Sequence, residues 1–199
     1  RKTIEWGLEG RVTAVHSISL ACHPISYRQE VYRISKDAGL SLKMPPEEEK
    51  PRDVVRDRAK SLTKKRQSNY IEGRLGLIID GTGRDFDKIS KQARELQGLG
   101  YDTHMIFVNT SLDTALLRNS QRARSVPEKI VVKSWNDVQK NIGKFSQLFR
   151  RNFVVVDNND ADEDVFGKVY KQVMHLAKSK VQNTLGRQWI ANELAKKSK

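Results

Sequence analysis

The chain has one cysteine, few aromatic residues and no long apolar run. With Cys22 alone among 199 residues, an internal disulfide and any multi-cysteine metal site are excluded. No apolar run approaches the ~20 residues needed to cross a bilayer, so we expect no membrane span and no membrane partner. A single cysteine favours a reducing compartment, and we therefore expect a cytoplasmic protein.

Acidic residues are also scarce relative to basic ones. The chain has 37 Lys and Arg but only 24 Asp and Glu, and its net charge is +13. Such a chain attracts polyanions, including nucleotide phosphates and nucleic acid. The alternative is a solvated basic surface without a partner. The basic residues cluster in 52–66 and 168–199. No aromatic stacking pattern or base-reading motif accompanies them, so nucleic acid stays one candidate partner among several.

Hydrophobic spacing predicts helices and strands that alternate from residue 54 onward. Alternation at this spacing indicates an α/β protein with a parallel sheet, doubly wound or three-layered, with right-handed crossovers. We also expect an earlier helix over 30–38, ended by Gly39. The expected helices are 52–70, 86–99, 112–122, 131–149, 163–178 and 189–197, and the expected strands are 75–79, 103–108 and 153–156.

A short apolar run ends abruptly in Asp80, and Gly81, Thr82 and Gly83 then turn the chain into a helix. A buried strand that delivers a carboxylate at its C-terminal tip is how α/β phosphotransferases hold a metal-bound water or a substrate hydroxyl. The competing interpretation is an ordinary turn in which Asp80 or Thr82 caps the helix that follows.

Polar residues follow the other two strands as well, as Asn109-Thr110 and Asp157-Asn158. Ligands of parallel sheets bind beyond such strand ends. A further segment presents three arginines before Pro127, namely Arg118, Arg122 and Arg124. Arginine forks stabilise charge on a transferring phosphoryl group, and a segment that carries them can close over a nucleotide. The alternative is a solvated helix end whose arginines suit the helix dipole.

The order and spacing of these motifs, from about Ala38 to the C-terminus, resemble the second half of P-loop kinases of the zeta-toxin type. The kinase-like proteins of large tailed phages look especially similar, and polynucleotide kinases are a more distant likeness. The resemblance implies a three-layer parallel sheet of P-loop kinase type over residues 30–199, with a lid near 118–134 and a basic C-terminal helix. It also implies the host cytoplasm as the location if a phage encodes the chain.

The resemblance implies roles for single residues too. Asp80 would lie at the metal and substrate side, and Arg124, with Arg122 or Arg118 as a second arginine, would contact the nucleotide phosphates. Asp157 and Asn158 would lie near the nucleotide base. The implied cofactors are ATP and Mg²⁺, and the implied reaction is phosphoryl transfer to a hydroxyl of a sugar, nucleotide or polynucleotide.

The N-terminal segment 1–29 departs from this pattern. Such kinases begin with Gly-x-x-x-x-Gly-Lys-Ser/Thr after a strand, whereas here Gly7 and Gly10 lie too close together and the lysine is missing. Where the family has a Ser-Asp strand end with the catalytic base, Ser26 is followed by Tyr27. Phosphoryl transfer is therefore expected to be impaired. The rival function is a non-catalytic nucleic-acid-binding or structural protein on a kinase scaffold.

Three explanations of this N-terminal departure remain. Residues 5–29 can be a shifted frame, since codons for 5–9 can spell Val-Gly-Pro-Gly and those for 26–29 can spell Leu-Ser-Ser. The chain can also be a diverged, inactive relative, or its N-terminal strand can have its own chemistry. The sequence fixes neither the phosphoryl acceptor nor the oligomeric state.

Two single residues outside these motifs are expected to serve packing rather than catalysis. His104 lies in an apolar run, so we expect a hydrogen-bonded core residue rather than a metal ligand. Trp135 is expected to pack against its neighbours, with stacking on a base as the minority alternative.

Overall fold

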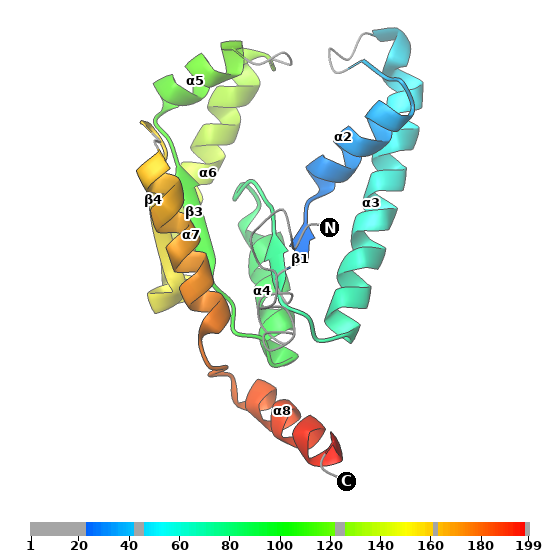
Figure 1. Ribbon diagram of the computed structural model, residues 1–199. Coiled ribbons are helices and arrows are strands. Elements are labelled where there is room, and N and C mark those ends of the chain that lie inside the picture. Colours follow the sequence, from blue (N-terminus) through cyan, green and yellow to red (C-terminus); the bar gives the residue numbers. More distant parts are fainter. Residues whose placement is uncertain (1–22, 42–45, 122–125, 161–162, 198–199) are drawn as a thin grey trace. The chain divides into compact units, whose positions relative to one another are not determined.

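The computed structural model describes residues 23–41, 46–121, 126–160 and 163–197 (Figure 1). The chain divides into two compact units. Unit 1 comprises Arg1–Gly81 and Val173–Lys178, and unit 2 comprises Thr82–Gln172 and Ser179–Lys199. Residues 1–22, most of the N-terminal segment 1–29, lie outside the described residues.

Unit 1 is a short parallel strand pair with two helices. Its elements are β1 (His23–Ile25), α2 (Tyr27–Asp37), the 3₁₀ helix η1 (Pro46–Glu48), α3 (Glu49–Glu72) and β2 (Leu77–Ile79). β1 and β2 run parallel, with His23 opposite Leu77 and Ile25 opposite Ile79. Ser26 begins α2, where its hydroxyl accepts a hydrogen bond from the Gln29 amide at 3.3 Å, the usual role of an N-cap serine.

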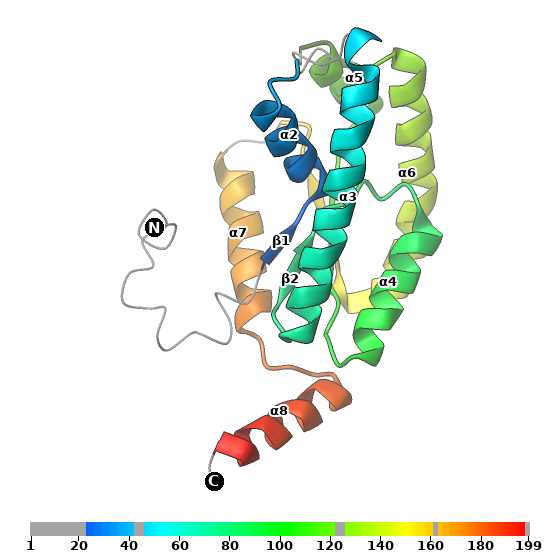
Figure 2. The same ribbon diagram turned by 90° about the vertical axis from the view of Figure 1, so that its right-hand side faces the viewer.

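The core of unit 1 is small and aliphatic. Ile34 of α2 and Val55 and Ala59 of α3 are buried, and they form one cluster with partly buried neighbours. Figure 2 shows α2 and α3 adjacent, as this packing requires. Ala38 is the C-cap of α2, and Gly39 follows with φ of 68°, a left-handed conformation that favours glycine.

Unit 2 contains the second strand pair, with helices before, between and after its strands. Its elements are α4 (Phe86–Gly98), β3 (Met105–Asn109), α5 (Leu112–Gln121), α6 (Glu128–Phe149), η2 (Arg150–Asn152), β4 (Phe153–Asp157), α7 (Glu163–Lys178) up to Gln172, and α8 (Thr184–Lys197). β3 and β4 are parallel over five residue pairs, from Met105 opposite Phe153 to Asn109 opposite Asp157.

The core of unit 2 is aromatic. Phe145 is fully buried, with its ring centroid 5.3 Å from that of Phe86 and 6.3 Å from that of Phe107. Phe149 and Phe153 extend the group, at 6.5 Å from Phe145 and 6.0 Å from Phe107. Tilted ring pairs at such distances add to the burial of apolar area, so this cluster holds α4 and α6 on the β3–β4 pair.

The start of α8 is fixed on unit 2 by polar and glycine contacts. The carboxylate of Asp102 accepts from the amides of Gln182 and Asn183 at 2.7 and 2.9 Å. Asn183 donates to the carbonyl of Gln97 at 2.8 Å. A side chain on Gly186 would collide with the backbone of Gly100, so this approach requires two glycines.

The predicted helices and parallel strands are confirmed, with differences at their ends. α6 starts at Glu128 rather than at 131, because Pro127 opens it, and α8 starts at Thr184 rather than at 189, because Asn183 caps it with its side-chain oxygen. His104 is exposed and precedes β3, so its predicted core position is wrong. No helix in the described ranges has the length and apolar character to cross a bilayer.

Candidate functional site

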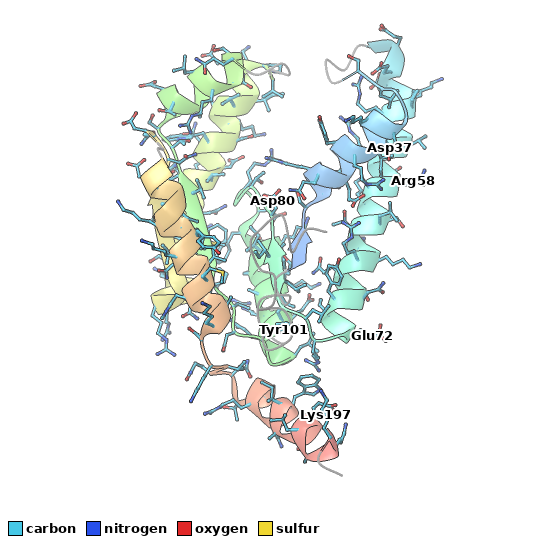
Figure 3. All side chains as sticks on the ribbon, viewed as in Figure 1. Asp37, Arg58, Glu72, Asp80, Tyr101 and Lys197 are labelled. Carbon is cyan, nitrogen blue, oxygen red and sulfur yellow. The ribbon has the colours of Figure 1, made fainter. Side chains whose placement is uncertain are left out.

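The two strands of unit 1 end in a serine and an aspartate that contact each other. Because Ile25 lies opposite Ile79 in the parallel pair, the next residue of each strand emerges at the same edge. The Ser26 hydroxyl donates to Oδ2 of Asp80 at 2.8 Å. Ser26 is buried and Asp80 is exposed at the end of β2, where Figure 3 labels it.

The alternative role of this turn as a helix cap is wrong. α4 is capped by Asp85, whose Oδ1 accepts from the Lys88 amide at 3.0 Å. Within the described parts of the chain, Oδ2 of Asp80 accepts from Ser26, and Oδ1 accepts no hydrogen bond.

The donors at this edge suit a magnesium ion that is shared with a bound phosphate. Mg²⁺ prefers oxygen ligands and is commonly held by one or two carboxylates, with substrate phosphates and waters completing an octahedron. Asp80 offers one carboxylate, and the hydroxyl of Ser26 lies beside it. The described residues contain no group of three or more His, Cys, Asp or Glu side chains placed to hold a metal. The carboxylate of Asp80 and the hydroxyl of Ser26 fit part of the oxygen shell of such an ion.

The turn after Asp80 is fixed within unit 2. Gly83 has φ of 70°, and a Cβ added there would lie 3.4 Å from the ring of Phe107. The side-chain amide of Asn141 donates to the carbonyls of Gly83 and Arg84 at 3.1 and 3.0 Å. Asn141 is buried in α6, and the sequence analysis missed it because its partners lie more than fifty residues away.

A dense polar network joins the ends of β3 and β4. The amide of Asn158 donates to the carbonyl of Asn109 at 2.8 Å, and Gln139 of α6 donates to Oδ1 of Asn109 at 2.8 Å. Oδ1 of Asp157 accepts from the amide and the side chain of Asn159 at 2.9 and 2.8 Å. These bonds define the shape of the loop that follows β4.

Arg118, Asp157 and Asn158, predicted as nucleotide-side residues, lie close together at this end of unit 2. The guanidinium of Arg118 donates to the carbonyl of Asn159 at 3.0 Å and so ties α5 to the loop. On the other side of the loop, Oδ1 of Asn159 accepts from the amide of Ser111 at 2.7 Å.

The two remaining predicted arginines, Arg122 and Arg124, lie outside the described residues. The flanks of their segment are described. Asn119 donates to the carbonyl of Val126 at 2.9 Å and accepts from its amide at 3.0 Å. One asparagine thus bridges the end of α5 and the approach to α6. Trp135 is half-buried in α6, and its indole N–H donates to the carbonyl of Thr110 at 2.9 Å.

Parallel strands with polar residues at their C-terminal ends, linked by helices, define an α/β protein. The family model described as Zeta toxin matches residues 43–168. This stretch covers more than half of the chain and contains Asp80, Arg118 and Asp157, and the chain therefore belongs to the zeta toxin family, whose fold is that of P-loop kinases. Comparison with curated proteins and with solved structures gave no match.

Proposed function

We propose that this chain is a kinase-like P-loop protein of the zeta-toxin type. Its family reaction is ATP-dependent phosphoryl transfer to a hydroxyl of a sugar, nucleotide or polynucleotide. The family match carries the proposal, together with the position of Asp80 at the end of a parallel strand. The proposal includes a three-layer parallel sheet and a kinase-like domain over 30–199, with a lid near 118–134 and a basic C-terminal helix.

Each predicted residue has a distinct role in this proposal. Bound ATP and Mg²⁺ would supply the transferable phosphoryl group and a counter-charge. Asp80 would hold the ion, and the hydrogen bond from Ser26 would keep its carboxylate aimed beyond the sheet edge. Arg122 and Arg124 would neutralise charge on the phosphates.

Arg118, Asp157 and Asn158 would form the nucleotide side of the site. Arg118 would partly serve to orient the loop that carries Asn159, because its guanidinium already donates a hydrogen bond to that loop. The host cytoplasm as the location of a phage-encoded chain belongs to the same proposal.

We further propose that catalysis is impaired in this chain, because segment 1–29 lacks a phosphate-loop lysine. The loop normally supplies several backbone amides and one lysine to the β- and γ-phosphates. The family match begins at residue 43 and so contains none of this segment. The three explanations of the departure stay open. If the encoding DNA has a stop codon or no Gly-Lys-Ser/Thr in the shifted frame, the first explanation fails.

Calorimetry with ATP and Mg²⁺ tests the proposal. We expect weak or no binding, and micromolar binding by this sequence would show that the N-terminal segment holds phosphate by other means. Any ATP binding that is found should be weakened by Arg124→Ala and by Asp80→Asn. Lys88→Ala serves as the control, because Lys88 is exposed on α4. Equal small losses from all three variants would indicate diffuse electrostatics and contradict the site.

A second function, non-catalytic nucleic-acid binding on the kinase scaffold, is favoured by the net charge of +13. The two functions differ in their response to salt. Steep salt dependence of DNA or RNA binding without any ATP binding supports the second. ATP binding with no measurable affinity for nucleic acid supports the first.

A further inference from the structure

A row of lysines runs along one side of α6. Lys129, Lys133, Lys140 and Lys144 are all exposed. Their spacings of four, seven and four residues keep them on one side of a helix with 3.6 residues per turn. Exposed Asn136 and Gln147 lie on the same side. At about 1.5 Å per residue, the row is roughly 22 Å long.

Unlike several exposed lysines in the described part of the chain, the lysines of this row have no carboxylate within ion-pair distance. Among the described residues, none of the four forms an ion pair, although α6 also carries Glu128 and Asp137. Lys60, Lys91 and Lys196, by contrast, each pair with a carboxylate three or four residues away. The charge of the α6 row is therefore left for an outside anion.

Lys144 of this row also contacts an aromatic ring. Its ammonium lies 5.5 Å from the centroid of the Phe86 ring, a cation–π contact that steadies the side chain. The other three lysines extend from the same side of α6 toward its N-terminus.

We propose that the lysine row of α6 binds the phosphate backbone of duplex nucleic acid without sequence preference. Each strand of a duplex carries one negative charge per about 3.4 Å of helix axis, so a straight row of four cations about 22 Å long can lie against several phosphates. The row contains no aromatic side chain on which an unpaired base could stack, which favours a duplex over a single strand. Trp135 is on another side of α6, with its N–H bonded to Thr110. The inference rests on the second function proposed above.

The test is fluorescence anisotropy with a labelled 20-base-pair DNA duplex over a range of salt concentrations. The variant Lys129→Gln/Lys133→Gln/Lys140→Gln removes three charges from the row, and glutamine keeps a good helix propensity. The matched control, Lys60→Gln/Lys91→Gln/Lys196→Gln, removes the same net charge from lysines that already have partners. Circular dichroism checks that both variants fold as the parent chain does.

We expect the row variant to lose duplex affinity on the order of a hundredfold at low salt. The slope of log K against log salt should fall by about 2 to 3, since each neutralised phosphate contributes about 0.9. The control should lose much less. Equal losses of affinity from both variants would contradict the assignment of binding to the lysine row of α6, although the chain would still bind nucleic acid. Tighter binding of a 20-nucleotide single strand would overturn the choice of a duplex. No binding by the parent chain would refute both the surface and the second function.

Discussion

The two units of this protein are stabilised by different means. Unit 1 has a small aliphatic core, and next to it lies Glu30, which is only 4% exposed. Its carboxylate pairs with Arg33 of α2 at 3.0 Å and with Arg66 of α3 at 2.6 Å. Unit 2 instead has an aromatic cluster around Phe145, and its buried polar residues are uncharged.

This difference has consequences for how each unit responds to change. An aromatic core depends on volume and shape, so truncation costs it most. A buried carboxylate depends on its charged partners, so a change of protonation state costs it most. The stability of unit 1 should therefore respond most to changes of charge, and the stability of unit 2 to changes of side-chain size.

The largest expected effect comes from Phe145→Ala in unit 2. Phe145 is fully buried among aromatic rings, and truncation of such a residue lowers the free energy of unfolding by about 3–5 kcal/mol. Hydrogen exchange should then rise in β3 and α6 but not in α2 and α3. Leu117→Ala is the control, because Leu117 is 58% exposed on α5. Equal loss of protection in α2 and α3 would show that the two units unfold together.

The next effect is that of Glu30→Gln in unit 1. The change weakens two charge-assisted hydrogen bonds, one to Arg33 within α2 and one to Arg66 of α3, and we expect the free energy of unfolding to fall by about 2 kcal/mol. Both arginines stay partly exposed and hydrated, which limits the loss. Asp37→Asn is a matched control, since Asp37 pairs with the same Arg33 at the surface, where Figure 3 labels it. Its loss should be below about 0.5 kcal/mol, and losses of equal size would mean that burial of Glu30 adds nothing.

Local signals in the sequence predicted most elements correctly. Helical periodicity and the Asp-Gly turn located α3, α4 and the end of β2, because both signals operate within a few residues. The starts of α6 and α8 were predicted too late in the chain. Pro127 and Asn183 are residue types that commonly mark the N-terminus of a helix, and they indicate the observed starts. His104 was misplaced because the apolar run begins only at Met105.

The contacts that shape the candidate site could not be predicted in the same way. The bond between Ser26 and Asp80 spans 54 residues and depends on the register of two short parallel strands. Asn141 reaches Gly83 across 58 residues, and only the packing of α6 brings them together. The sequence predicted which residues end the strands, and long-range packing decides which partners they meet.

A smaller effect is expected from Asn141→Ala. This variant is an exception to the expectation that the stability of unit 2 depends on the size of its buried side chains. The change removes the donor for the carbonyls of Gly83 and Arg84, and we expect a loss of about 1–2 kcal/mol although little apolar volume is removed. Hydrogen exchange in the turn after Asp80 should rise. Asn136→Ala on the exposed side of α6 is the control. Indistinguishable variants would mean that solvent replaces the lost bonds at no cost.

The smallest effect is a difference in the pH at which each unit loses stability. Burial alone would raise the pKa of Glu30, but the hydrogen bonds and charges of Arg33 and Arg66 outweigh it and hold the pKa below its ordinary value of 4.5. This stabilisation is complete above pH 4.5 and is lost as the pH falls through the lowered pKa, because the unfolded chain then binds the proton first.

In unit 2, His104 is exposed overall, but the protein covers part of its ring, and this loss of hydration is the main cause that lowers its pKa below 6.5, with Asp102 opposing the shift and Arg151 adding to it. The unfolded chain again binds the proton first, so this stabilisation is lost as the pH falls from 6.5 toward the lowered pKa. Unit 2 should therefore begin to lose stability at a higher pH than unit 1.

Hydrogen exchange at stepwise lower pH, corrected for the intrinsic exchange rate, measures both transitions. His104→Gln should remove the first, and Glu30→Gln should remove the second. If Glu30→Gln abolished the His104-linked transition as well, the two units would share one ionisation-linked unfolding event, and their separate stabilisation would be refuted.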